Sequence, residues 1–125
     1  MRLLVDTHIL IWMLMDDSRL NSKARQTIAG ATGILVSSAS IWEIAIKVRV
    51  GKLRIDLARL ISRMALTGID ELTVTNTHAL ATAQLPMLHR DPFDRMLVAQ
   101  AMTESAELLT ADVRLAPYSD LVVLV

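Results

Sequence analysis

Short apolar runs alternate along the chain with longer stretches in which apolar residues recur at a helical spacing. Leu3, Leu4 and Val5 form a continuous apolar run that Asp6 ends, which is typical of a strand buried on both faces of a parallel sheet. Runs of this kind predict strands over residues 1–5, 34–36, 71–74, 107–110 and 121–125.

Helices are predicted between these strands. Apolar side chains share one helical face from residue 40 until Gly51, and Asp56 and Gly68 bracket a second amphipathic stretch. Asp91 followed by Pro92 is a typical helix start. The predicted helices cover residues 8–15, 22–31, 40–50, 57–66, 77–83 and 92–105, with one helical turn at 112–115.

The order of these elements, β-α-α-β-α-α-β-α-α-β-(α)-β, predicts an α/β fold. We expect a three-layer α/β/α arrangement with a mainly parallel central sheet of about five strands. In such sheets ligands bind beyond the carboxyl ends of the strands, so candidate chemistry is sought at that edge.

Composition narrows the possible functions. The chain has 125 residues, of which 53% are hydrophobic and 21% charged, with a mean hydropathy of +0.43. This excludes disorder, and no apolar run reaches the roughly 18 residues of a membrane span. We expect one soluble domain over residues 1–125, and the absence of cysteine is compatible with a cytoplasmic location. The apolar fraction is high for this size and predicts an interface.

Charge excludes a general attraction to nucleic acid. Thirteen basic and thirteen acidic residues give a net charge of zero, so any contact with RNA or DNA must be local. Lys47, Arg49, Lys52 and Arg54 form one such local cluster, and Arg95 lies beside Asp94. We select Lys47 and Arg95 as candidate RNA-binding residues, against the alternatives of a solvated helix face and an ion pair between Lys47 and Glu43.

Four acidic residues lie at or near the predicted strand ends: Asp6, Glu43, Asp94 and Asp112. Each also has a structural interpretation. Asp6 and Asp112 are possible helix caps, Glu43 fits a capping box with Ser40, and Asp94 suits the first turn of a helix. Together, however, carboxylates at one sheet edge repel one another, and Mg²⁺ or Mn²⁺ would offset that repulsion. An acidic site holding such ions is a recurrent arrangement for phosphodiester hydrolysis.

These residues also carry a family resemblance. Four segments resemble the acidic blocks of PIN-domain nucleases, in the same order and spacing: Leu4-Val5-Asp6-Thr7-His8, residues 37–44, residues 89–95 and Leu109-Thr110-Ala111-Asp112. The resemblance is closest to the toxin component of VapBC-type toxin–antitoxin pairs and spans residues 3 to about 112.

The resemblance implies an endoribonuclease that depends on Mg²⁺ or Mn²⁺. It also implies a homodimer or a higher toxin–antitoxin assembly, and a cognate antitoxin whose tail occupies the active-site groove. The family's catalytic and metal-binding acids match Asp6, Glu43, Asp94 and Asp112, and Thr7 and Thr110 match its supporting hydroxyl residues. Asp91 lies three residues before Asp94 on the predicted helix, so both could face the metals; we favour Asp94 for the site and Asp91 as the N-cap.

Other residue types are weaker candidates. His8, His78 and His89 lie in different segments without ligand spacing, which argues against a histidine-based metal site, although His8 is placed to line the groove. Trp12, Trp42 and Phe93 have apolar neighbours, which favours packing in the core or at an interface over stacking on bases.

Two other function classes compete. A phosphatase with an aspartyl nucleophile also places Asp after the first strand, but usually with a second Asp two residues later, where this chain has His8. A receiver-like binding domain would need an acidic pair at Asp6 and a lysine near the last strand, and residues 121–125 contain none.

Overall fold

The five strands form a single parallel sheet. The computed structural model describes all 125 residues. The strands are β1 (Arg2–Val5), β2 (Gly33–Ser37), β3 (Asp70–Leu72), β4 (Glu107–Thr110) and β5 (Val122–Leu124). They lie in the order β3-β2-β1-β4-β5, and every neighbouring pair is parallel. The predicted sheet is therefore confirmed, and it is wholly rather than mainly parallel.

The helices follow the predicted order. They are α1 (Thr7–Leu14), α2 (Ser22–Ala29), α3 (Ser38–Arg49), α4 (Leu57–Leu66), α5 (Asn76–Ala81) and α6 (Pro92–Glu104), with 3₁₀ helices η1 (Thr82–Gln84) and η2 (Val113–Tyr118). None of them combines the length and the apolar character that crossing a bilayer requires. Most bounds fall within two residues of the prediction; β3 ends two residues early, and η2 extends the expected turn.

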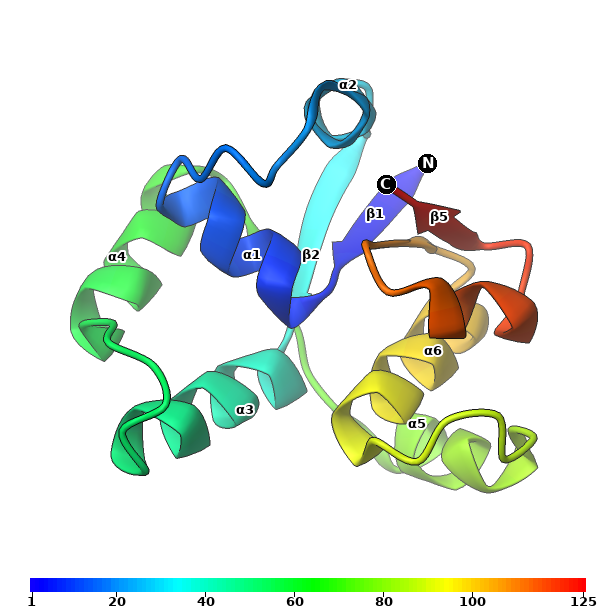
Figure 1. The fold of residues 1–125 in the computed structure, drawn as a ribbon. Helices are drawn as coiled ribbons and strands as arrows, with labels where there is room; N and C mark the ends of the chain where they lie inside the picture. The colour runs from blue at the N-terminus through cyan, green and yellow to red at the C-terminus, as the bar shows by residue number, and fades with distance from the viewer.

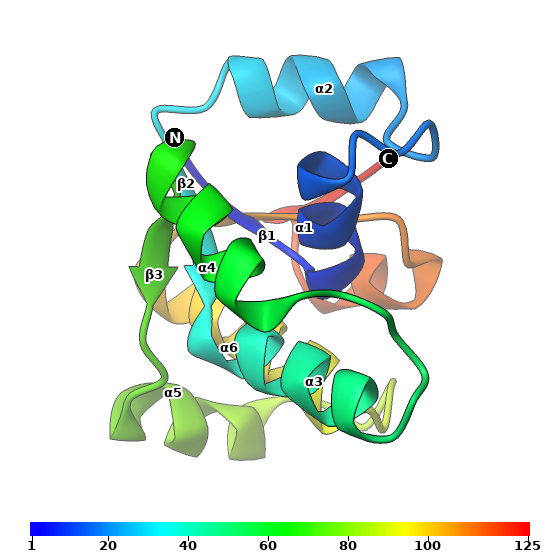
Figure 2. The same cartoon turned by 90° about the vertical axis from the view of Figure 1, so that its left-hand side faces the viewer.

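The sheet separates two apolar cores, which explains the apolar runs on the strands. Leu4 aligns with Leu35 and Leu108, and these side chains pack against α6. The next residue, Val5, aligns with Leu109 and faces the other core, beneath α1, α2 and α4. Both faces are thus covered, as Figures 1 and 2 show, and the three-layer α/β/α prediction is confirmed.

The carboxyl ends of the strands all point to one edge of the sheet. There β1 passes into α1 through Asp6, β2 passes directly into α3, and β4 ends before η2. Figure 1 shows α3 and α6 on either side of the point where β1 meets α1. This edge carries the candidate chemistry.

Candidate active site

Asp6 is the most deeply buried of the four acids, with 5% of its surface exposed. Its Oδ1 caps α1 by accepting a hydrogen bond from the backbone N–H of Ile9 at 2.9 Å, and its Oδ2 accepts one from the hydroxyl of Thr110. Burial raises the pKa of Asp6 above its ordinary value, against the lowering effect of these two hydrogen bonds. Asp6 therefore caps α1, and its burial disfavours the ionised form of its carboxyl group.

Glu43 lies inside α3 and is held by two partners. Its Oε1 accepts a hydrogen bond from the Thr7 hydroxyl at 2.7 Å, and its Oε2 lies 3.0 Å from the ammonium of Lys47. The proposed capping box between Ser40 and Glu43 is wrong. The helix begins two residues earlier and is capped by Ser37, whose hydroxyl accepts from the N–H of Ala39 at 3.0 Å. Glu43 is thus free of a capping task.

Asp94 lies in the first turn of α6. Its Oδ2 is 2.8 Å from Nε2 of His89, which lies in the loop before the helix. Burial is the main cause that raises the pKa of Asp94, and the charges of Asp91 and Asp6 raise it further. This coupling shows that Asp94 and Asp6, from separate elements, lie near one another.

Asp112 follows β4 and is more exposed. Its carboxylate accepts a two-pronged hydrogen bond from the guanidinium of Arg114, at 2.9 Å from Nε and 2.8 Å from Nη2, which holds the pKa of Asp112 below its usual range. It also caps η2 through the N–H of Arg114. The backbone N–H of Asp112 donates to the hydroxyl of Thr110 at 3.0 Å, so Thr110 links Asp112 to Asp6.

The donor set fits a divalent cation. Ligand atoms of His89, Asp94 and Asp112 all lie within 4.8 Å of one another. The charge of Glu43 also raises the pKa of Asp6, so the buried carboxylates repel each other without an ion to offset them. Carboxylate oxygens are the ligands that Mg²⁺ and Mn²⁺ prefer.

Asp91 is the N-cap of α6, as favoured from sequence. Its Oδ1 accepts from the backbone N–H groups of Phe93 and Asp94, at 2.8 and 3.1 Å. Pro92 occupies the first turn of the helix, where its missing N–H costs nothing.

The guanidinium of Arg95 has a structural task. It donates to the carbonyl oxygens of Thr82 and Pro86, both at 2.9 Å, and lies 3.3 Å from the hydroxyl of Tyr118. These bonds fasten the loop between η1 and α6 to the helix. Contact between Arg95 and RNA stays a prediction. In this structure the guanidinium of Arg95 bonds to the loop instead. Lys47 forms the expected pair with Glu43 and is one-third exposed.

The aromatic residues divide between core and surface. Trp12 packs against the core beneath α1. Trp42 is 64% exposed, so the core placement is wrong for it. Its ring lies 5.3 Å from that of Phe93, and both line an apolar hollow of about 620 Å³ between α3 and α6. That Trp42 and Phe93 pack at an interface with another chain stays a prediction.

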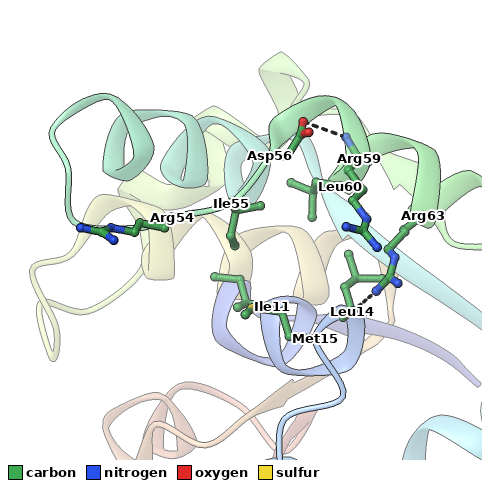
Figure 3. A pocket seen from close by; sticks show the side chains of 9 residues that line it. All are labelled: Ile11, Leu14, Met15, Arg54, Ile55, Asp56, Arg59, Leu60 and Arg63. Atoms are coloured by element: carbon green, nitrogen blue, oxygen red, sulfur yellow. Dashed lines mark hydrogen bonds between the residues drawn. The ribbon is translucent and has the colours of Figure 1, made fainter.

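A second hollow, of about 300 Å³, combines apolar and basic residues and contains none of the four acids. Figure 3 shows Ile11, Leu14 and Leu60 in its interior, with Arg54 at one end and Arg59 and Arg63 at the other. Arg63 donates to the carbonyl oxygen of Leu14, whereas Arg54 and Arg59 have no carboxylate partner for their side chains.

Sequence reasoning missed His89 and Arg114 as partners of the acids. His78 behaves as expected of a structural residue, being buried with its Nε2 2.9 Å from Glu104. His89 precedes Asp94 by five residues across a helix start, a spacing that has no regular geometry. Arg114 has a local signal, because an Asp that caps a turn often faces the side chain two residues later.

Comparison with known proteins identifies the family. The sequence matches the PIN domain over residues 3–121, and the chain belongs to this family. No match was found among curated proteins.

Solved structures of similar fold include toxin–antitoxin complexes. The VapBC2 complex of Rickettsia felis bound to a promoter DNA fragment gives a TM-score of 0.71 at 15% identity, covering 100% of this chain and 98% of the other. A toxin–antitoxin complex from Klebsiella pneumoniae gives 0.67 at 21% identity, covering 96% and 94%. VapBC-1 of nontypeable Haemophilus influenzae gives 0.66 at 16% identity, covering 95% and 96%. At these identities the likeness establishes the fold.

Proposed function

We propose that this chain is a metal-dependent endoribonuclease and the toxin of a two-component toxin–antitoxin system. The observation that carries the proposal is the meeting of Asp6, Glu43 and Asp94 at the carboxyl edge of the sheet in a PIN-domain chain, where the charge of Glu43 raises the pKa of Asp6 and the charge of Asp6 raises the pKa of Asp94. A fold does not retain buried, mutually repelling carboxylates for stability alone.

Each residue has a task in this proposal. Asp6, Asp94, Glu43 and Asp112 hold Mg²⁺ or Mn²⁺, directly or through water. When bound, the ion supplies positive charge that polarises the scissile phosphate and the attacking water. The hydroxyls of Thr110 and Thr7 orient Asp6 and Glu43 by donating hydrogen bonds to them.

The substrate is held by local positive charge. With a net charge of zero, the chain relies on cations near the acids, and Lys47 on α3 is the nearest to Glu43. Arg49 and Lys52 continue this positive stretch along the chain without carboxylate partners. We expect them to contact phosphates of single-stranded or loop RNA.

The antitoxin is the proposed protein partner, and the structures of similar fold that are toxin–antitoxin complexes support it. In addition to the tail expected in the active-site groove, we assign to it the hollow of Figure 3, which Asp56 also lines and where apolar residues lie between arginines without ion pairs. A segment with apolar anchors and flanking carboxylates matches this chemistry. A second copy of the chain and a cytoplasmic location belong to the same proposal.

Substitution of Asp6 and Asp94 tests the nuclease activity. Asp6→Asn retains the helix cap, because Asn caps as well as Asp, and removes one charged ligand. We expect each variant to lose cleavage of a single-stranded RNA in Mg²⁺ or Mn²⁺ by more than about 100-fold, with the far-ultraviolet circular dichroism unchanged. Metal-dependent cleavage that survives in both variants would falsify the proposal.

Expression in cells tests the toxin role. We expect growth arrest by the wild-type chain, none by Asp94→Ala, and relief when the protein encoded immediately upstream is co-expressed. In the same assay Arg59→Glu should weaken the relief, because it reverses the charge at one end of the hollow. Arrest by Asp94→Ala at equal expression contradicts the role.

A further inference from the structure

We infer that His89 is a nitrogen ligand of the metal site, which makes this site prefer Mn²⁺ and similar transition ions over Mg²⁺. The inference rests on the proposed function, because it concerns the ion of that same site. It starts from the one group of side chains in the structure that has metal-ligand geometry and contains a histidine: His89, Asp94 and Asp112.

The distance between His89 and Asp94 suits two ligands of one ion. Nε2 of His89 and Oδ2 of Asp94 are 2.8 Å apart. Adjacent ligand atoms on an octahedral ion with bonds of about 2.1 Å are separated by about 3 Å. A shared proton and a shared ion therefore demand nearly the same separation of the two ligand atoms, and a turn of the two side chains would aim both atoms at an ion.

Three elements converge on this point. His89 comes from the loop before α6, Asp94 from the first turn of α6, and Asp112 from the end of β4. The side chain of His89 is only 10% exposed, whereas an imidazole without a task at an acidic edge would be free to turn toward water. The site thus offers one nitrogen and two carboxylates on separate supports.

The loop that carries His89 is fastened from both sides. The backbone N–H of His89 donates to the hydroxyl of Tyr118 at 2.9 Å. Arg95, the residue after Asp94, donates to the same hydroxyl at 3.3 Å and to the carbonyl of Pro86 at 2.9 Å. Tyr118 and Arg95 are therefore positioning residues that fix His89 relative to Asp94.

A nitrogen ligand changes which ion is favoured. Mg²⁺ takes oxygen ligands, whereas imidazole suits the transition metals, whose affinities rise from Mn²⁺ to Co²⁺. A site made of the four carboxylates alone would bind Mg²⁺ and Mn²⁺ with little distinction. With His89 as a ligand, this one side chain raises the ratio of Mn²⁺ affinity to Mg²⁺ affinity.

The test measures binding and the ligand atoms directly, without RNA. Calorimetric titration of the full chain with MnCl₂ and with MgCl₂ gives the affinity ratio. Electron spin echo spectroscopy of bound Mn²⁺ reports directly coordinated nitrogen. We expect nitrogen modulation in the wild type and in the control His8→Gln, which removes an imidazole near Asp6 that is outside the group. His89→Gln should lose the modulation and about tenfold in Mn²⁺ affinity, with Mg²⁺ affinity changed less than about twofold.

A second variant covers the case in which His89→Gln fails to fold. Tyr118→Phe keeps the ring and removes only the hydroxyl that holds His89, so we expect a fall in the Mn²⁺ to Mg²⁺ ratio with weakened nitrogen modulation. Mn²⁺ bound without nitrogen modulation in the wild type overturns the inference and leaves the nuclease proposal standing. Absence of any Mn²⁺ or Mg²⁺ binding by the wild type overturns both.

Discussion

The two halves of the acidic site hold their carboxylates in different ways. The inner half, Asp6 and Glu43, is buried and is served by the hydroxyls of Thr110 and Thr7. The outer half, Asp94 and Asp112, has side chains exposed by 22% and 23% and is paired with His89 and Arg114. Each inner acid accepts from a neutral hydroxyl, and Glu43 also pairs with the ammonium of Lys47, whereas the outer acids have only ionisable or charged side-chain partners.

The difference teaches which half is fixed by the fold. Asp6 directly follows strand β1 and Glu43 lies on helix α3, and the positions of both elements follow from their packing in the core. Among the outer acids, Asp94 is paired with His89 from a loop, and Asp112 is paired with the exposed side chain of Arg114, and an exposed pair contributes little to stability. We therefore expect changes to the partners of the inner acids to affect catalysis strongly, and changes to the partners of the outer acids to adjust ion affinity.

Among changes to the partners of the acids, Thr110→Val gives the largest expected effect, because Thr110 joins the halves. Its hydroxyl donates to Oδ2 of Asp6 and accepts from the N–H of Asp112, so the change leaves one buried carboxylate oxygen and one backbone donor without a partner. We expect RNA cleavage to fall by about 10–100-fold in single-turnover assays. Thr7→Val is the matched control, since its hydroxyl serves Glu43 alone. An equal loss in Thr7→Val would contradict the linking role.

Arg114→Met acts in the opposite direction. The guanidinium of Arg114 occupies both carboxylate oxygens of Asp112 and so competes with an ion. An exposed pair of this kind contributes little, so we expect a gain in Mn²⁺ affinity of no more than about fivefold. Calorimetric titration of both proteins measures it. A loss of affinity on this substitution would show that Arg114 supports the site rather than competing for it.

The metal-free protein should show the cost of the buried charge. Because burial raises the pKa of Asp6 above its ordinary 3.8, the folded chain holds that proton more tightly than the unfolded chain. The contribution of Asp6 to stability is therefore greatest below that value and is lost as pH rises through the folded-state pKa of Asp6. In EDTA at neutral pH, Asp6→Asn should raise Tm by a few degrees, at about 4 °C per kcal/mol. Thermal unfolding from pH 4 to 8 measures this, and a parallel pH dependence in both proteins argues against it.

Lys47→Met should have the smallest effect. One phosphate contact fewer on single-stranded RNA lowers the slope of log affinity against log salt by about 0.7. Binding of RNA to the Asp94→Asn protein, with and without Lys47→Met, isolates this from cleavage. Arg95→Met would change the slope equally only if its guanidinium left the loop carbonyls for RNA.

The fold was largely predictable because its signals are local. Apolar runs and caps such as Asp56 and Asp91 report on neighbours within a few residues, and the elements they predict are present with small shifts at their ends. The one local signal that failed was the spacing of Ser40 and Glu43. It matches a capping box, but β2 runs on to Ser37 and the helix starts at once, so Ser37 supplies the cap.

The surroundings of the acids were not predictable in the same way. Arg95 next to Asp94 resembles a phosphate-binding residue in sequence, yet its guanidinium is engaged by Thr82, Pro86 and Tyr118. Neither the conformation of that loop nor the arrival of Tyr118 from 29 residues beyond His89 has a repeat that a sequence pattern could carry.

By itself the sequence determined the order of elements, the parallel sheet and the acids that follow its strands, because periodicity and turn chemistry act over short distances. Only the tertiary structure decided how those acids are paired: Thr110 donates to Asp6 and Thr7 to Glu43, whereas Asp94 meets an imidazole and Asp112 a guanidinium. The physical reason is that pKa values and ligand geometry depend on burial and on charges brought together from distant segments.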